Sequence, residues 1–283
     1  MANTREVKEI AKRIKRDVIQ LTSKNTGHPG GAIGAADIIA ELYFNRLHHR
    51  PSHPDWEDRD RFVLSNGHIC TALYSAMARS GYFPIEELWT FRKLNSRLQG
   101  HPSRIDLPGL ETSAGPLGQG LSIANGMALA HRLRGSDAKI YCLVGDGEIQ
   151  EGQVWESAMT AAHHHLDQIA LIVSWNDIQI DGHVKDVMNI EPIAEKFKAF
   201  GWHTIEIDGN KVNEIKNAFD QFEQNTGAPT AIIAKTVIGK DVSFMEDEAI
   251  WHGKAPSAEE ATRALEEIGT CSFGTDLITK EEY

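Results

Sequence analysis

The chain has 283 residues and a formal net charge of −11 at pH 7, because 40 acidic residues outnumber 29 Lys and Arg. This acidic balance argues against nucleic acid, or an anionic membrane surface, as a general partner. Hydrophobic residues make up 41% of the chain, which is enough for a large core, and the length suits a single α/β domain over residues 1–283.

The first predicted element is a helix over residues 3–24. Asn3 and Glu6 have the spacing of a capping box, and apolar residues recur at helical intervals at Val7, Ile10, Ala11, Ile14, Val18 and Leu21. The segment mixes basic with acidic residues and lacks an apolar run, so it does not have the pattern of a targeting signal. No other run is apolar for long enough to cross a membrane.

From residue 61 onward, short β-rich runs alternate with helical patterns. The predicted strands are Arg61–Ser65, Lys139–Val144, Gln168–Ser174, His203–Ile207 and Thr230–Thr236, and the predicted helices include Ile149–His165, Ile193–Phe200 and Lys211–Gln224. The runs IYCLV and IALIV are apolar throughout, as expected for strands buried on both faces. The alternation predicts an α/β fold with a parallel sheet flanked by helices on both faces, and functional loops at the carboxyl ends of the strands.

Glycine-rich loops mark places where the backbone can approach a ligand closely. They are GHPGG at 27–31, SNGH at 65–68, GHP at 100–102, GPLGQG at 115–120 and GDG at 145–147. The stretch from Val237 to Pro256 has no clear periodicity, and a loop of that length in a compact domain is usually functional or mobile. We expect residues 237–256 to form an active-site loop.

Asp146 and Asn176 are candidate ligands of a metal ion. Asp146 directly follows one predicted strand and Asn176 follows the next, about one strand–helix–strand unit later. Both side chains can therefore lie at one sheet edge, where carboxylate, amide and backbone carbonyl oxygens suit Mg²⁺. A helix beginning near Ile149 would point free N–H groups at the same place. GDG alone would be an ordinary turn, but the spacing to Asn176 favours the metal site.

Two other groups of residues do not have the spacing of metal ligands. The three cysteines, Cys70, Cys142 and Cys271, are an odd number and lie far apart, which indicates reduced thiols in a cytoplasmic protein. The consecutive residues His163, His164 and His165 would point around a helix in different directions and could not chelate one ion together.

The loops resemble those of the transketolase family of thiamine-diphosphate enzymes. GDGEIQEG followed by NDIQIDGHV resembles the family's version of the thiamine-diphosphate motif, in which GDG is followed by Asn about one βαβ unit later. SKNTGHPGGAIGAADI, RDRFVLSNGH, GHP, TSAGPLGQGLSIANGMA and HGKAP also resemble family blocks, in the family's order from residue 23 to residue 256. The resemblance implies a thiamine-diphosphate-binding fold, and within it the domain that binds the diphosphate.

The resemblance also implies how the cofactor is held. It implies Mg²⁺, for which Ca²⁺ or Mn²⁺ are possible substitutes, bound by Asp146, Asn176 and the carbonyl of Ile178. Gly147 and His68 would contact the diphosphate. The residues that would line the cofactor near its aminopyrimidine are Gly115, Pro116 and Leu117.

Transfer of a two-carbon ketol unit from a ketose or its phosphate to an aldose or its phosphate is the activity that the resemblance implies, as in the pentose phosphate pathway. The cofactor would serve as the electron sink, and histidine suits proton transfer near neutral pH. His28 and His252 would handle protons on the donor, His101 would contact the ketose C1 hydroxyl, and His252 would also lie beside the cofactor.

The resemblance also bears on residues near the family's subunit interface and on those just before Asn176. Glu151 and Glu156 match acidic residues that lie at this interface in the family. Ser174 and Trp175 stand where the family usually has one or two acidic residues before the metal-binding Asn. This departure leaves the implied metal ligands in place but changes the surroundings of the cofactor.

The resemblance covers one of the family's three domains. In the family, the glutamate that activates the aminopyrimidine lies on the second, pyrimidine-binding domain, and the arginines that grip the sugar phosphate lie largely beyond the matched region. The chain ends at Tyr283, shortly after the first domain's pattern. We therefore expect a separate C-terminal subunit, with the pyrimidine-binding and C-terminal domains, in an α2β2 assembly.

Two alternative functions remain open at this point. One is a subunit of another thiamine-diphosphate enzyme, such as the α subunit of a 2-oxoacid dehydrogenase, although decarboxylation does not need a set of hydroxyl-reading histidines. The other is a non-catalytic protein that binds the cofactor or regulates a partner, which the intact Asp146, Asn176, His28 and His252 disfavour.

Overall fold

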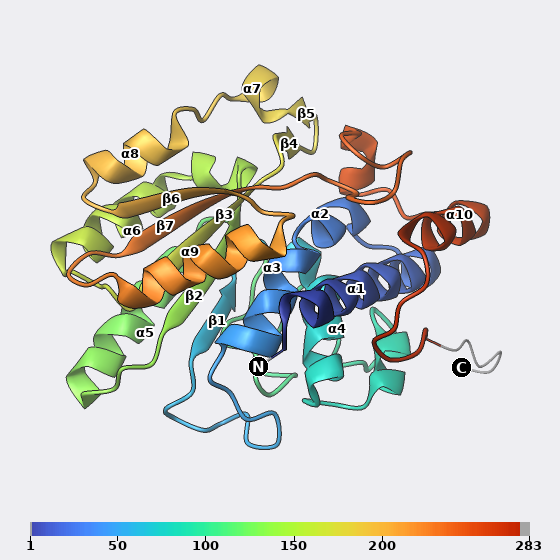
Figure 1. Cartoon of the computed structure of the whole chain (residues 1–283), viewed down its shortest axis with the longest axis horizontal. Coiled ribbons are helices and arrows are strands. Elements are labelled where there is room, and N and C mark those ends of the chain that lie inside the picture. The colour runs from blue at the N-terminus through green and yellow to red at the C-terminus, as the bar shows by residue number, and fades with distance from the viewer. Residues whose placement is uncertain (1, 278–283) are drawn as a thin grey trace.

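Five parallel strands form the centre of the molecule (Figure 1). The computed structural model describes residues 2–277, so Met1 and residues 278–283 of the expected domain lie outside the described part. The strands are β1 (Arg61–Leu64), β2 (Ile140–Gly145), β3 (Ile169–Trp175), β6 (His203–Asp208) and β7 (Thr230–Lys235), in the spatial order β1-β2-β3-β7-β6. All neighbouring pairs are parallel. The five predicted strands are thus confirmed, with ends shifted by at most one residue.

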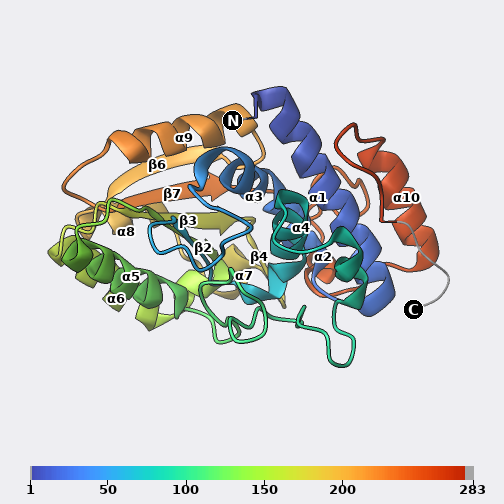
Figure 2. The ribbon, with the colours of Figure 1, turned by 90° about the horizontal axis from the view of Figure 1, so that it is seen from below.

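Helices cover both faces of the sheet, as predicted (Figure 2). One face shares a hydrophobic cluster with α1 (Thr4–Asn25), α3 (Ala36–Glu41), α4 (Cys70–Ser80) and α9 (Val212–Gln224), and the other face shares one with α5 (Gly120–Arg134), α6 (Gly152–His163) and α8 (Ile193–Ala199). The remaining helices are α2 (Pro29–Gly34), α7 (Val184–Val187) and α10 (Ala258–Ile268). Shorter elements are a π-helical turn at Leu42–Arg46, 3-10 turns at Gly67–Ile69, Ile85–Thr90, Gly147–Gln150 and Ala249–His252, and the hairpin of β4 (Ile178–Gln179) and β5 (Gly182–His183).

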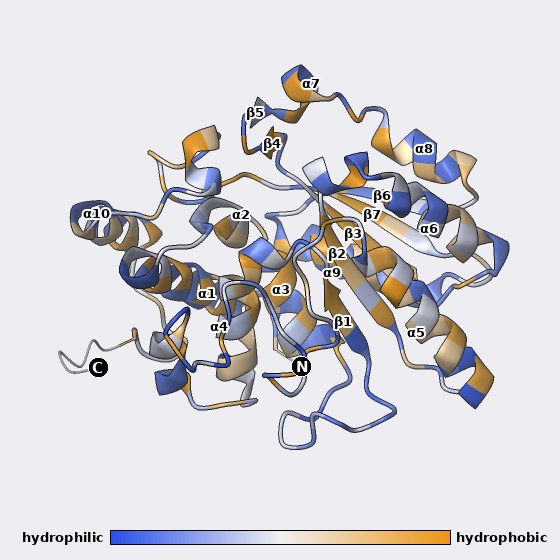
Figure 3. Ribbon diagram, turned by 180° about the vertical axis from the view of Figure 1, so that it is seen from behind, coloured by the Kyte–Doolittle hydropathy of each residue, from blue (hydrophilic) through white to orange (hydrophobic). Residues whose placement is uncertain are grey.

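Alternating residues of β1, β2, β3 and β7 divide the core into two clusters. On β2, Tyr141 and Leu143 face the cluster that includes α1, α4 and α9, whereas Cys142 and Val144 face the cluster of α5, α6 and α8. In Figure 3 the inner strands β2 and β3 are mostly in the hydrophobic colour. A sheet buried on both faces needs apolar side chains at successive positions, which explains the unbroken apolar runs in the sequence.

The predicted helix over residues 149–165 is wrong at its start. Residues Gly147–Gln150 form a 3-10 turn, Glu151 is extended, and α6 begins only at Gly152. The side chain of Asp146 caps the 3-10 turn by accepting a hydrogen bond of 2.8 Å from the amide of Gly147. The N–H groups that directly follow Asp146 in the chain therefore belong to this turn rather than to an α-helix end. The other two predicted helices are confirmed as α8 and α9, with ends shifted by one residue at most.

The predicted N-terminal helix is confirmed as α1. Asn3 accepts hydrogen bonds from the amides of Arg5 and Glu6, and Glu6 accepts one from the amide of Asn3, which completes the capping box. Its polar face includes the buried cations Arg13 and Arg16. These two arginines bind the end of the described chain.

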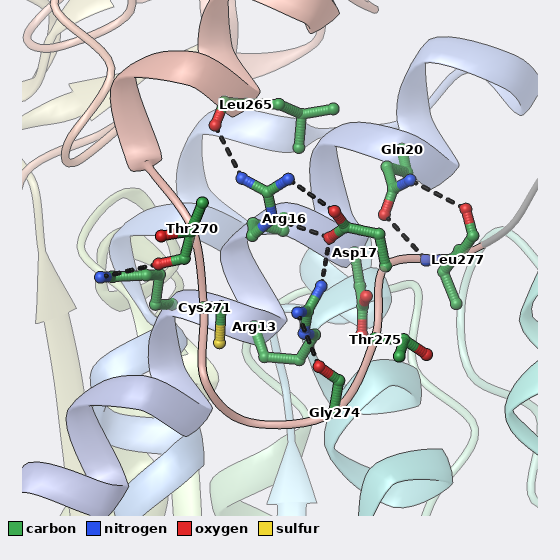
Figure 4. Close-up of polar contacts among 12 residues, drawn as sticks. Arg13, Arg16, Asp17, Gln20, Leu265, Thr270, Cys271, Gly274, Thr275 and Leu277 are labelled. Carbon is green, nitrogen blue, oxygen red and sulfur yellow. Dashed lines mark hydrogen bonds and ion pairs between the residues drawn. The ribbon is translucent and has the colours of Figure 1, made fainter.

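Residues 269–277, together with Glu9, Arg13, Arg16 and Gln20 of α1, form what we call the C-terminal clasp. Arg16 forms two hydrogen bonds of 2.7 Å to the Asp276 carboxylate and donates to the carbonyls of Leu265 and Gly269. Arg13 also pairs with Asp276 and donates to the carbonyls of Phe273 and Gly274. Figure 4 shows Arg13, Arg16 and Gln20 reaching this segment from one side of α1. The clasp thus fixes the chain beyond α10 to the first helix.

Residues 237–256 are packed against the domain. Val242, Met245 and Trp251 of this segment are buried, and the amide of Gly239 donates to the carbonyl of Gly30 at 3.0 Å. A Cβ atom at Gly30 would lie 2.5 Å from Ile238 Cγ1, so glycine permits the close approach of α2 to this segment. The absence of periodicity in the sequence therefore reflects an irregular but ordered segment.

None of the three cysteines forms a disulfide bond. Cys70, Cys142 and Cys271 are free thiols, and the first two are buried. Within residues 2–277, no helix combines the length and the apolar character needed to cross a membrane.

Candidate active site

The carboxyl ends of β1, β2 and β3 border a cavity of about 400 Å³, which we call the cleft. Ligands of open parallel sheets bind outside the carboxyl ends of the strands, so this is the expected place for a site. The described residues that line the cleft are His28, Gly31, Asn66, His68, Ile69, His101, Gly115, Leu117, Gly145, Asp146, Gly147, Glu148, Gln150, Glu151, Ser174, Asn176, Ile178, Gln179, Ile180 and His252.

Asp146 and Asn176 lie together in the cleft on neighbouring strand ends. One carboxylate oxygen of Asp146 accepts a hydrogen bond from the amide of Gly147 at 2.8 Å, and the other accepts one from the amide of Asp177 at 2.6 Å. The side-chain oxygen of Asn176 accepts from the amide of Ile178 at 2.9 Å. These bonds hold the side chains in place, and each oxygen keeps a lone pair that can bind a cation.

Burial makes the Asp146 carboxylate costly to ionise. It raises the pKa of Asp146 to about 7, although hydrogen bonds from the backbone of Gly147 and Asp177 oppose this shift. The described residues contain no group of three or more His, Cys, Asp or Glu side chains that could hold a metal ion. A cation bound here would therefore rely on one carboxylate together with amide, carbonyl and ligand oxygens, a set that suits Mg²⁺.

Four histidines from four different loops converge in the cleft. The ring of His28 lies 5.3 Å from that of His68, 6.4 Å from that of His101 and 5.7 Å from that of His252, measured between centroids. The rings of His68 and His252 are 5.1 Å apart. Residues separated by more than 200 positions in the chain thus form one cluster, as the family resemblance implies.

All four histidines are held in the neutral form. Burial lowers the pKa of His28 to about 4 and that of His68 to about 3, and the neighbouring histidines add to both shifts. Burial also lowers the pKa of His101 and His252. Neutral imidazoles at pH 7 can accept a proton from a substrate hydroxyl, or donate their single N–H to a substrate oxygen.

Two buried polar atoms in the cleft have no hydrogen-bond partner within the described chain. They are Nδ1 of His28 and the side-chain oxygen of Asn66, which is 3% exposed. Gly115 also lines the cleft, and a Cβ atom at this position would have no atom of the described chain within 4 Å other than those of its neighbours in sequence. Buried polar atoms are normally paired, so this arrangement fits a cleft that receives a polar ligand. The residues present therefore fit a metal ion with a diphosphate.

Most of the residues predicted from the sequence line the cleft. They are His28, His68, His101, His252, Gly115, Leu117, Asp146, Gly147, Asn176 and Ile178. Pro116 is exposed and is not among the described residues that line the cleft. Glu151 lies at the cleft and Glu156 on α6, and both are exposed.

The two unusual residues before Asn176 have different surroundings. Ser174 lies in the cleft and shares a hydrogen bond of 3.1 Å with Thr236. The ammonium group of Lys235 lies over the ring of Trp175, 5.4 Å from the ring centroid. Position 174 thus presents a hydroxyl to the cleft, and position 175 presents an aromatic ring to Lys235.

Sequence reasoning missed several residues of the cleft. Asn66 precedes Gly67 in the SNGH loop, and Glu148 follows the GDG loop; both are buried. Gln150 donates to Gln179 at 2.6 Å across one wall. The positive charge of Arg92 lowers the pKa of both His28 and His101. The loop motifs bracket Asn66 and Glu148, but only the fold shows which side chains of these loops turn inward.

Comparisons with known proteins identify the family of the chain. The family model described as "transketolase, thiamine diphosphate binding domain" matches residues 6–276. The chain is 40% identical over 242 residues to the 6-deoxy-6-sulfo-D-fructose transketolase subunit SqwG of Clostridium sp. (strain MSTE9), covering 86% of this chain and 88% of that one. It is 37% identical over 265 residues to an apulose-4-phosphate transketolase subunit of Actinobacillus succinogenes, covering 93% and 96% respectively.

The chain is also similar to solved structures of transketolases. The chain superimposes on the transketolase of Campylobacter jejuni with a TM-score of 0.87 and 38% identity, covering 95% of this chain but 43% of that one. For the transketolase of Leishmania mexicana the TM-score is 0.89 and the identity 30%, with 99% and 43% covered. The chain therefore spans most of its subunit relatives but less than half of these longer chains.

Proposed function

Because the chain belongs to the transketolase family and is its N-terminal, thiamine-diphosphate-binding domain, we propose that it is the diphosphate-binding subunit of a split transketolase. One observation carries this proposal. A single cleft joins Asp146 and Asn176, which suit a metal-bound diphosphate, to four neutral histidines, which suit a sugar with several hydroxyls. On this proposal, the domain comprises residues 1–283, and residues 237–256 are an active-site segment that brings His252 to the cleft.

The cofactor would be held at the ends of β2 and β3. Asp146, Asn176 and the carbonyl of Ile178 would bind Mg²⁺, with Ca²⁺ or Mn²⁺ as possible substitutes. Gly147 and His68 would contact the diphosphate, and Gly115, Pro116 and Leu117 would line the cofactor farther along. When bound, thiamine diphosphate supplies the electron sink for breaking and forming a carbon–carbon bond next to a carbonyl.

The histidines would position the sugar and transfer its protons. His28 and His252 are neutral and 5.7 Å apart between ring centroids, so both can act on oxygens of one bound donor. His101 is more exposed, which suits contact with the terminal C1 hydroxyl. The unpaired Nδ1 of His28 is available for such a contact.

The substrates would be a ketose donor and an aldose acceptor, each free, phosphorylated or sulfonated. Two relatives are named for 6-deoxy-6-sulfo-D-fructose and apulose-4-phosphate, so sugar use differs among related subunits. Donors of the pentose phosphate pathway belong to the same chemical class. The positive charge of Arg92 near His28 and His101 favours a donor with an anionic group.

A second subunit would complete the site. Leu117 and Ile180 line the cleft although they are large, apolar and exposed, and exposed apolar surface of this kind favours association. Glu151, directly before α6, and Glu156, on α6, are also exposed. The partner would carry the pyrimidine-binding and C-terminal domains, and twofold pairing would give an α2β2 assembly.

Ketol transfer in the presence of the adjacent gene's product tests this function. The chain and that product are co-expressed, purified together and assayed with ketose donors and aldose acceptors, with and without thiamine diphosphate and Mg²⁺. We expect cofactor-dependent transfer by the pair. Decarboxylation of a 2-oxoacid would instead support a dehydrogenase subunit. Cofactor binding with no turnover of either kind would support a non-catalytic protein.

A further inference from the structure

A single buried carboxylate connects three of the loops that surround the cleft. Glu148, which is 2% exposed, follows the GDG loop in the 3-10 turn. One of its oxygens accepts a hydrogen bond of 2.8 Å from the amide of Gly118 and another from the hydroxyl of Ser65. Its other oxygen accepts from the amide of Gly145 at 3.1 Å. The donors lie 30, 83 and 3 positions away along the chain.

The hydroxyl of Ser65 extends this connection by one bond. Since Ser65 donates its proton to Glu148, its oxygen is free to accept, and the amide of Gly120 donates to it at 2.9 Å. The fit is close, because a Cβ atom at Gly120 would lie 2.3 Å from this oxygen. The amides of Gly118 and Gly120 are thus both held by the Ser65–Glu148 pair.

Each connected loop also contributes a residue that faces the cleft. Asp146 and Gly147 lie between Gly145 and Glu148, Asn66 and His68 follow Ser65, and Leu117 precedes Gly118. A movement of any one loop would therefore change the distances between these groups. Residues 65–69, 111–119 and 146–150 are irregular, turn or 3-10 in structure, so regular secondary structure fixes these loops only at Gly120 and Gly145, where α5 begins and β2 ends.

We propose that Glu148 is a positioning residue that locks the GDG, SNGH and GPLGQG loops into the arrangement that binds the cofactor. The inference rests on the proposed function for the cofactor that it serves. Removal of partners that orient ligands of this kind typically weakens binding about 10- to 100-fold. Glu148 itself contacts backbone and Ser65, and its effect on the cofactor is indirect.

Asp60 provides a matched control. It is also a buried carboxylate, and it accepts hydrogen bonds from two backbone amides of separate segments, those of His48 and Lys139, both at 2.8 Å. It lies just before β1, at the amino ends of the strands and so at the opposite edge of the sheet from the cleft. Its replacement should affect folding stability in a similar way but should leave the cofactor loops unchanged.

Hydrogen–deuterium exchange of wild type, Glu148→Gln, Ser65→Ala and Asp60→Asn tests the locking without the cofactor. Glutamine has one acceptor oxygen and an NH₂ group that cannot accept, so at least one of the three donors loses its partner. We expect amides in residues 113–120 and 145–148 to exchange about 10-fold faster in Glu148→Gln, as for the loss of one hydrogen bond. In Asp60→Asn the change should be confined to the segments around His48 and Lys139.

Titration of the assembled proteins with thiamine diphosphate and Mg²⁺ then tests the purpose of the locking. We expect about 10- to 100-fold weaker binding by Glu148→Gln than by wild type, recovery of kcat at saturating cofactor, and wild-type affinity in Asp60→Asn. Unchanged loop exchange, or faster exchange with wild-type affinity, would overturn the inference and leave the proposed function standing. Wild-type protein that binds no cofactor would overturn the proposed function, while the exchange data would still decide whether Glu148 holds the loops.

Discussion

The cleft and the C-terminal clasp both contain many polar side chains. In the clasp these side chains are hydrogen-bonded to one another or to backbone, whereas in the cleft some of them have no partner in the described chain. In the clasp, Arg16 forms two bonds to Asp276 and two to backbone carbonyls, and Arg13 is bonded similarly. In the cleft, the side-chain oxygen of Asn66 and Nδ1 of His28 are buried without a partner in the described chain. Charge in the clasp is paired, whereas Asp146 in the cleft is a buried carboxylate with a raised pKa.

On the proposed function, this difference separates polar groups that stabilise the fold from polar groups that bind a ligand. A buried polar atom without a partner lowers the free energy of unfolding by about 1–3 kcal/mol. The unpaired atoms of the cleft therefore do not contribute to folding stability. The clasp has the opposite character, since its bonds join α1 to residues more than 250 positions away. We therefore expect mutations in the cleft to affect binding and turnover, and mutations in the clasp to affect stability.

Replacement of two cleft histidines should give the largest effects. We expect His28→Ala to keep the cofactor but to lower kcat about 10²- to 10⁴-fold, as for a lost proton-transfer group. His68→Ala should mainly weaken the cofactor. Steady-state kinetics of the assembled enzyme over a range of cofactor concentrations separates the two outcomes, and equal effects on cofactor affinity would show that the roles are confused.

Gly30→Ala should change the cleft indirectly, through the contact between α2 and residues 237–256. The added methyl group would lie 2.5 Å from Ile238 Cγ1 and 2.7 Å from the carbonyl of Trp251, so residues 237–256 must move away from α2 and carry His252 away from His28. A misplacement of about 1 Å can lower turnover roughly 10²-fold. The control is Gly126→Ala on α5, where a Cβ has open space, and which should be neutral or slightly stabilising. Normal kcat in Gly30→Ala would show that this contact does not position His252.

Asp276→Asn should destabilise the fold and leave the cleft intact. The change leaves the buried Arg13 and Arg16 without their shared anion, but solvent reaches the Asp276 carboxylate, which is 43% exposed. We therefore expect a loss of about 1–2 kcal/mol in the free energy of unfolding, below the roughly 3–5 kcal/mol of a fully buried pair. Urea unfolding measures this loss. Lys216→Gln, which breaks an exposed pair with Asp220, should have no measurable effect.

The smallest expected effect concerns pH. The cleft and the C-terminal clasp should make the free energy of unfolding depend on pH in different ranges. His28 and His68 have folded pKa values of about 4 and 3, below the ordinary 6.5, so the unfolded chain binds more protons and stability falls as pH drops from about 6.5 toward 4. Asp276 and Glu9 have pKa values of about 2, lowered chiefly by hydrogen bonds, so their contribution is lost between about pH 4.5 and 2. Urea unfolding gives the free energy of unfolding at each pH. We expect His28→Gln to reduce its pH dependence only between about pH 6.5 and 4, and Asp276→Asn to reduce it only between about pH 4.5 and 2. Identical profiles for both variants would contradict this separation.

Much of the fold can be predicted from local patterns in the sequence. The strands predicted around the apolar runs IYCLV and IALIV match β2 and β3 to within one residue, because strands buried on both faces require such runs. The GDG loop and Asn176 are predicted to meet because consecutive parallel strands bring their carboxyl ends together. The four cleft histidines are predicted from the family resemblance, since their positions along the chain do not show that they meet.

Other features depend on contacts between distant residues. The start of α6 is displaced because Glu148 turns inward to bond Gly118 and Ser65, which no helical pattern reveals. Residues 237–256 have no periodicity because they are ordered by contacts with α2 rather than by a regular element. The clasp depends on Asp276 meeting Arg16 across 260 positions, and charge patterns along the sequence do not specify such a pair.

Calorimetric titration of thiamine diphosphate into the assembled protein tests the central claim most directly. Wild type, Asp146→Ala and Asp276→Asn are compared, each with Mg²⁺ and with a chelator. We predict that wild type binds in a Mg²⁺-dependent manner, that Asp146→Ala stays folded but binds at least about 100-fold more weakly, and that Asp276→Asn binds like wild type despite its lower stability. Wild-type affinity in Asp146→Ala would contradict the assignment of the cleft.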